Sequence, residues 1–206
     1  MSVLVAFGFL LVIASLADVI AASIPHLRDG TIPDDPYMRN YVHHAWPAAL
    51  HIAPGLVYLF LAPLQLSARF RRKHLTLHRR LGRVLLVCGL TAGVFALLIG
   101  LSHPFDGVVE ATATVVFGAW FLTALVLAFL AVRRRDIATH RHWMIRAFAA
   151  GIGIASIRLW VGIFGGIQKA ITGAEGTPPL QGSYGLAFWM GFASTVLVGE
   201  WWLRRK

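Results

Sequence analysis

The sequence is poor in charged residues, and acidic residues are the scarcest of them. Only 14% of its 206 residues are charged and only nine are Asp or Glu, whereas 57% are hydrophobic and the mean hydropathy is +0.68. A soluble domain of this size needs more polar surface than these residues can supply. The composition therefore predicts an all-α polytopic membrane protein, because helices satisfy their backbone hydrogen bonds within the bilayer.

Cysteine is nearly absent as well. Cys88 is the only one, so an intrachain disulfide and a cysteine-based metal site are both excluded. The sequence also lacks a glycine-rich phosphate loop, a His-Glu-x-x-His motif, paired catalytic carboxylates and a nucleophile elbow. No motif of a known enzyme class is left, and the sequence does not decide whether the protein is an enzyme.

Six apolar segments are each long enough to cross a hydrocarbon core of about 30 Å as a helix. They cover residues 2–24, 47–68, 81–101, 110–132, 142–168 and 183–203. No basic residue precedes the first segment, so we expect a retained helix there, not a cleaved signal. Linkers, low-complexity tracts and clear internal repeats are lacking. The chain is expected to form a single domain over residues 1–206, a bundle of six transmembrane helices.

The formal net charge of +10 is explained by topology. The segments 69–83, 133–146 and 204–206 carry 15 Lys and Arg, and the loops 25–46, 102–109 and 169–182 carry three. By the positive-inside rule, both termini are expected in the cytoplasm, with the basic loops on anionic lipid headgroups. A nucleic-acid partner is not expected, because little positive charge remains to be explained.

The nine histidines divide between the two expected sides of the membrane. His74, His78, His140 and His142 lie at the cytoplasmic ends, and His26, His43, His44, His51 and His103 lie at the exterior ends. Histidines at both ends of a helix bundle are what a bis-histidine haem protein needs. The pattern favours His78 with His140 on one side. On the other side it favours His51, with His44 or His103 as its opposing ligand.

Simpler interpretations of these histidines stand beside the haem hypothesis. His74 and His78 fit a headgroup surface equally well. His140 and His142 are two positions apart and cannot share a helix face, so at most one of them serves a given site. His51, inside a span, needs a partner, and an interhelical hydrogen bond satisfies that need as well as an iron does.

Arg158 is the strongest single functional signal, because a cation deep in a span costs at least ~2.5–3.5 kcal/mol on insertion scales. Asp18 is the expected partner in a structural intramembrane ion pair, and Glu110 is the second choice. Glu200 lies too near the other membrane surface. The alternative role for Arg158 is a cofactor contact, to a haem propionate or a quinone carbonyl.

Several motifs resemble a known bacterial family. They are Leu77–Arg83, Arg133–Asp136 with His140–Arg146, Arg158–Trp160, Glu200 and the segment from His51 to Gln65. Together they resemble the predicted membrane proteins filed as domain of unknown function 2306. The resemblance implies a multi-helix protein of the bacterial inner membrane, with His51, His78, His140, Arg158 and Glu200 as the positions of interest.

These observations lead to three functional hypotheses. The first is a b-type haem protein for transmembrane or quinone-linked electron transfer, with His51, His78 and His140 as metal ligands. In it His44, His103 or His142 completes the set, and Arg158 contacts a propionate or a quinone. The second is a cofactor-free accessory subunit of a larger membrane complex. The third is a small transporter or proton-coupled carrier, which at this length requires a homodimer.

Overall fold

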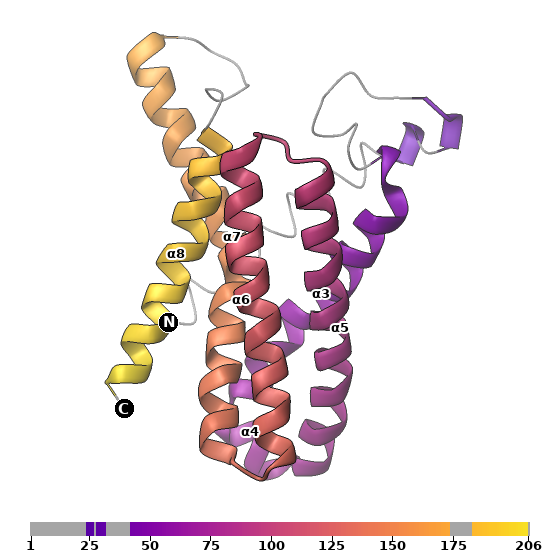
Figure 1. The fold of residues 1–206 in the computed structure, drawn as a ribbon, viewed down its shortest axis with the longest axis vertical. Helices are drawn as coiled ribbons and strands as arrows, with labels where there is room; N and C mark the ends of the chain where they lie inside the picture. Colours follow the sequence, from indigo (N-terminus) through magenta and orange to yellow (C-terminus); the bar gives the residue numbers. More distant parts are fainter. Residues whose placement is uncertain (1–23, 27, 32–41, 174–182, 206) are drawn as a thin grey trace.

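A computed structural model describes residues 24–26, 28–31, 42–173 and 183–205 (Figure 1). The helices from residue 45 onward are α3 (Ala45–Leu66), α4 (Ala68–Lys73), α5 (Leu75–Ser102), α6 (Val108–Arg133), α7 (Ile137–Thr172) and α8 (Ser183–Arg204). The residues in these ranges form no strand. The predicted all-α class is confirmed for this part of the chain.

Five of these helices, α3, α5, α6, α7 and α8, are long and apolar enough to cross a membrane. The shortest, α3 and α8, have 22 residues. That length corresponds to about 33 Å of helix, slightly more than the hydrocarbon core of about 30 Å. The second to sixth expected spans are thus found as helices. The first expected span, residues 2–24, lies outside the described residues except for its last one, so a six-span count stays a prediction.

The helices extend beyond the apolar segments that mark them in the sequence. α5 begins at Leu75 and not at residue 81, and α7 runs from Ile137 to Thr172 and not from 142 to 168. The carboxylate of Asp136 caps α7 by accepting the Thr139 N–H at 3.0 Å, and its hydrogen bonds with Thr139 lower the pKa of Asp136. Hydropathy marks only the part of a helix within lipid, and helical backbone hydrogen bonds continue into the basic headgroup region.

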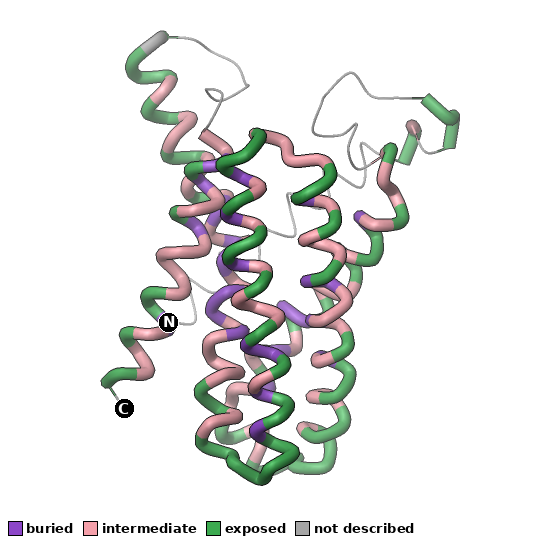
Figure 2. Tube along the Cα trace, viewed as in Figure 1, coloured by how far each residue is buried: buried purple, intermediate pink, exposed green. Residues whose placement is uncertain are grey.

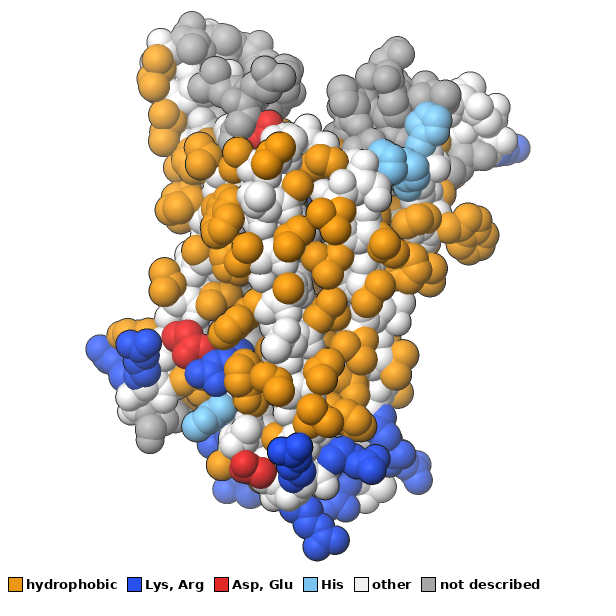
Figure 3. Space-filling view, viewed as in Figure 1, with side chains coloured by type: hydrophobic (Ala, Val, Ile, Leu, Met, Phe, Trp, Pro, Cys, Tyr) orange, Lys and Arg blue, Asp and Glu red, His pale blue; other side chains and the backbone are white. Residues whose placement is uncertain are grey.

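The five long helices run alternately up and down (Figure 1). Each packs on its neighbour in sequence, α3 also meets α7, and α8 packs against both α7 and α6. We call the end with α4 and the α6–α7 turn the basic end, because Lys and Arg side chains gather there (Figure 3). We call the end with the α5–α6 turn, residues 103–107, the turn end.

The core is built largely from small residues. Its central cluster consists of Tyr58, Ala62, Leu85, Ala124, Leu125 and Ala147. Between α7 and α8 the backbones approach so closely that a Cβ on Gly191 would lie 2.9 Å from the backbone nitrogen of Ile157. On α7, the small residues Ala147 and Ala155 are both buried. Farther along the same helix, no neighbouring atom of the described residues lies within 4 Å of a Cβ built on Gly162 or Gly166.

The outer surface of the bundle is apolar between its two ends. Buried residues lie along the inner faces of the helices, and exposed residues lie on the outside (Figure 2). Hydrophobic side chains cover the visible face between the ends (Figure 3). Val87, Leu98 and Leu197 are 64%, 50% and 67% exposed, which would be unfavourable in water but is expected of residues that face lipid.

Candidate functional site

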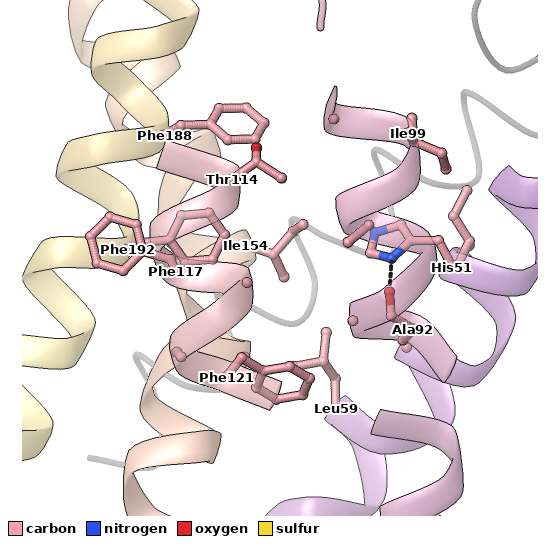
Figure 4. Close-up of a pocket in the computed structure, with 18 of the residues that line it drawn as sticks. His51, Leu59, Ala92, Ile99, Thr114, Phe117, Phe121, Ile154, Phe188 and Phe192 are labelled. Atoms are coloured by element: carbon pink, nitrogen blue, oxygen red, sulfur yellow. Dashed lines mark hydrogen bonds between the residues drawn. The ribbon is translucent and has the colours of Figure 1, made fainter. Parts of the chain in front are cut away.

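A cavity of about 230 Å³ lies among α3, α5, α6, α7 and α8, in the half of the bundle toward the turn end (Figure 4). Five phenylalanine side chains contribute to its walls: Phe105, Phe117, Phe121, Phe188 and Phe192. Its polar side chains are few: His51, Tyr58, Glu110, Thr114 and Arg158. An apolar, aromatic chamber with a few polar groups is the usual character of a small-molecule site.

His51 extends from α3 into this cavity, opposite Phe117, Ile154 and Phe188 (Figure 4). Its Nδ1 is hydrogen-bonded to the carbonyl oxygen of Ala92 on α5 at 2.9 Å. A carbonyl can only accept, so Nδ1 carries the proton and Nε2 of the neutral ring is a hydrogen-bond acceptor. The interhelical bond expected for a histidine inside a span is therefore present, and it fixes the tautomer.

Glu110, in the first turn of α6, is 2% exposed. Its Oε2 accepts the backbone N–H of Asp106 at 2.7 Å, and the carboxylate of Asp106 accepts the N–H of Gly185 at 2.8 Å. The two acids therefore join the start of α6 to the start of α8. One signal for this arrangement is visible in the sequence, an Asp and a Glu four positions apart across a glycine at a helix start, and sequence reasoning did not use it.

Tyr58 lies at the deep end of the cavity. Its side chain is 2% exposed, and its hydroxyl has no hydrogen-bond partner among the described residues. The ring is held between two glycines, because Cβ atoms on Gly89 and Gly151 would lie 3.1 and 3.2 Å from it. The edge of the ring faces Phe121, with centroids 5.3 Å apart. Sequence reasoning missed this residue, since a tyrosine in an apolar span has no distinguishing pattern.

Arg158 lines the cavity and also a smaller neighbouring chamber of about 70 Å³. Phe105, Ile154 and Phe188 line both spaces as well, so the two adjoin. The role of Arg158 as a contact for a bound group stays a prediction. Asp18, its expected ion-pair partner, lies outside the described residues, so that pair stays a prediction.

The other histidines of the turn end are not in the cavity. His44, just before α3, and His103, just after α5, stack with ring centroids 3.7 Å apart. Rings at this distance leave no room for a macrocycle between them. Burial, together with the charges of His103 and then His43, lowers the pKa of His44.

At the basic end, His140 repeats the arrangement of His51. Its Nδ1 is hydrogen-bonded to the carbonyl oxygen of Ala128 on α6 at 2.9 Å, which leaves Nε2 as an acceptor. His78 on α5 lies within electrostatic range of His140, and its Nδ1 is buried without a described partner. His142 is exposed on the other side of the helix. No group of three or more His, Cys, Asp or Glu that could hold a metal occurs in the described ranges.

The acid near the end of the chain has a partner that sequence reasoning did not identify. Arg146 on α7 makes a two-point ion pair with Glu200 on α8, with its Nη2 3.0 Å from Oε2. The Arg146 guanidinium also lies over the Trp143 ring, 4.7 Å from its centroid. Glu200 therefore joins two helices near the basic end and takes no part in the cavity.

The helices and the internal cavity define a multi-pass, all-helical membrane protein. Residues 48–203 match the family of predicted membrane proteins filed as domain of unknown function 2306, and the chain belongs to that family. The resemblance drawn from the motifs around His51, His78 and His140 is thereby confirmed. Comparison with curated proteins and with solved structures gives no match.

Proposed function

We propose that the protein binds a quinone-type ring in the cavity and takes part in quinone-linked electron transfer within the membrane. The observation that carries this proposal is the fixed tautomer of His51 in an aromatic chamber. Its Nε2 is a hydrogen-bond acceptor, and the hydroxyl of a quinol is a matching donor. Arg158, which also lines the chamber, is a donor for an oxygen of either redox form.

The walls of the cavity support a flat ligand. Phe117 and Phe121 on α6, with Phe188 and Phe192 on α8, offer ring surfaces that favour stacked or edge-on aromatic contacts. The cavity volume of about 230 Å³ is slightly smaller than that of typical drug-sized sites, which measure about 300–1,000 Å³. It therefore suits a single substituted ring better than a four-ring macrocycle. The neighbouring apolar chamber gives room for the first part of a hydrophobic tail.

The distribution of charge supports a definite orientation. We infer that the basic end faces the cytoplasm and that both termini lie there, in an inner-membrane protein, because Lys and Arg gather at one end of the bundle. The cavity then lies in the half of the bundle nearer the exterior.

Calorimetric titration of the purified protein with a short-tailed quinone, in reduced and oxidised form, tests the proposal. We expect the quinol to bind about tenfold more tightly than the quinone, because only the quinol donates to Nε2 of His51. His51→Phe should reduce this ratio to about one. His74→Phe, at an exposed histidine between α4 and α5, is the matched control and should keep it. Absence of saturable binding by either form would contradict the proposal.

One observation favours a second candidate function, electron transfer through a bound haem b. His140, like His51, has Nδ1 bonded to a backbone carbonyl, which is the arrangement that orients an imidazole for a metal at Nε2. His78, in range of His140, is the candidate for the opposing ligand at the basic end. A haem there would supply a one-electron carrier for the ring in the cavity. At the turn end the stacked His44 and His103 give no support for a haem between them.

An ultraviolet–visible spectrum of the purified protein, oxidised and then reduced with dithionite, tests the haem. A Soret band with sharp reduced α and β bands, both lost in His140→Ala, is the expected result. A bare protein spectrum from cells with adequate iron would contradict it. Co-purification of a stoichiometric partner with that bare spectrum would favour the accessory-subunit alternative.

A further inference from the structure

We infer that Tyr58 is a second anchor for the ring, and that the site selects rings with two oxygens in para positions, of the 1,4-quinol class. This inference rests on the proposed function and specifies its ligand. One polar group in the cavity wall, the hydroxyl of Tyr58, is unusual. The hydroxyl of Tyr58 is deeply buried in a side chain that lines the cavity, and no described atom accepts or donates a hydrogen bond to it. Buried polar groups in native proteins nearly always have a partner.

The spacing along α3 defines the distance between the two anchors. His51 and Tyr58 are seven residues apart, so both lie on the same face of the helix, about 10.5 Å apart along its axis. A ring with two para oxygens and one hydrogen bond at each end spans about 11 Å. The rise between the two Cα atoms is close to this length, so we expect one ring oriented along α3 to reach His51 with one oxygen and Tyr58 with the other.

The surface between the anchors is suited to a flat ring. Gly55, one turn from His51, has no side chain, and a Cβ built on it would lie 3.6 Å from the Cβ of Ala92 on α5. Ala92 and Ala96 on α5 also have small side chains, so little side-chain volume protrudes into this part of the cavity. Phe117 and Phe121 on α6 line the facing wall, and the Phe121 ring extends toward Leu59 at one end of the cavity (Figure 4). The ring would therefore lie over Gly55, with an aromatic wall on its other face.

The position of the Tyr58 hydroxyl is fixed before a ligand binds. The ring of Tyr58 is clamped between Gly89 on α5 and Gly151 on α7, and Phe121 meets it edge-on. A donor held in this way loses little conformational freedom on binding, so it adds both affinity and orientation. His51 is also held, by its bond to the Ala92 carbonyl. The two anchors form a rigid pair on one helix.

The test compares three small ligands on the wild type and on Tyr58→Phe, which removes only the hydroxyl. The ligands are a short-tailed 1,4-quinol, its mono-methyl ether with the methylated oxygen remote from the tail, and the corresponding 1,2-diol. We expect the wild type to bind the 1,4-quinol at least tenfold more tightly than the 1,2-diol. Tyr58→Phe should weaken 1,4-quinol binding about tenfold and ether binding less than twofold. Thr195→Val also removes a hydroxyl but lies on α8 outside the lining of both spaces, so it is the matched control and should change neither.

A second variant examines the surface between the anchors. Gly55→Val places a branched side chain where the ring would lie and should abolish 1,4-quinol binding, while Gly162→Val, in open space on α7, should leave it intact. Near-ultraviolet circular dichroism spectra or thermal unfolding curves that match the wild type show that each variant is folded. Tight 1,4-quinol binding that is unchanged in Tyr58→Phe would overturn this inference alone. A wild type that binds none of the three ligands would overturn the proposed function with it.

Discussion

The two halves of the bundle are built from similarly apolar helices, yet one is packed and the other is hollow. Toward the basic end, large side chains meet small ones: Leu125 lies where Gly89 leaves space, and Leu85 packs with Ala62 and Ala147. Toward the turn end, small residues from three helices line the cavity. They are Gly55, Ala92, Ala96, Ala150 and Gly151. In this bundle the sizes of facing residues, and not overall hydropathy, therefore decide where the cavity lies.

The largest expected effect is on the free energy of unfolding, when one large side chain is removed from each half in turn. Leu125→Ala removes a fully buried side chain from the packed half and should lower the free energy of unfolding by about 3 kcal/mol. Ile154→Ala enlarges a space that already exists and should cost about 1 kcal/mol. Thermal unfolding in detergent measures both. Equal losses would show that the two halves are packed to the same density.

A smaller difference in the free energy of unfolding is expected between substitutions at Glu110 and at Glu200. Glu110→Ala leaves the buried N–H of Asp106 without its acceptor and should cost about 2 kcal/mol. Glu200→Ala breaks an ion pair whose side chains are about one quarter exposed, and should cost about 1 kcal/mol or less. The midpoints of thermal unfolding compare the two, and Glu110→Gln serves as the conservative control. A larger loss for Glu200→Ala would reverse the expected ranking of the two ends.

Glycine substitutions on the α7–α8 pair should give effects of opposite sign. Gly191→Ala forces a Cβ to within 2.9 Å of the Ile157 backbone nitrogen and should destabilise the protein by about 1–3 kcal/mol. Gly162→Ala meets no described atom, so it should stabilise α7 by about 0.5–1 kcal/mol through helix propensity alone. Melting temperatures that fall in both variants would indicate that a further neighbour covers Gly162.

The smallest expected effect is a dependence on pH at the turn end. The folded pKa of His44 lies below its unfolded value of about 6.5, so the folded state binds fewer protons than the unfolded chain. Its contribution to stability is complete above the unfolded pKa of about 6.5 and is lost as the pH falls from there through the lower folded pKa. The melting temperature should therefore decrease slightly from pH 7.5 to 5.5, and less so in His103→Gln. A steeper decrease in His103→Gln than in the wild type would contradict the stacking.

The sequence was informative wherever a feature is local. The apolar lengths predicted the second to sixth spans, and the need of His51 for a partner predicted an interhelical bond, although not that the Ala92 carbonyl would provide it. The motifs of the loops identified the family correctly. Helix ends such as Leu75 and Thr172 were placed too close to the apolar segments, because hydropathy does not record a helix that continues into headgroups.

The cavity could not be read from the sequence, because it arises from several helices. Gly55 and Ala96 are ordinary small residues in their own spans, and only the packing of α3 on α5 places them around one space. The lack of a hydrogen-bond partner for the Tyr58 hydroxyl among the described residues is likewise a property of the assembled bundle. Arg158 was the exception, because a cation in an apolar span is visible without any knowledge of its neighbours.

The seven-residue interval between His51 and Tyr58 has a consequence for how this helix can change during evolution. Each residue of an α-helix turns the next by about 100°. A single insertion or deletion between the two positions would therefore carry one anchor off the inner face, although every side chain of the site would still be encoded. Substitutions can alter α3 one position at a time, whereas a change of length between its anchors would separate them in one step. Among related chains, gaps near this helix should fall before Ala45 or after Leu66, outside α3.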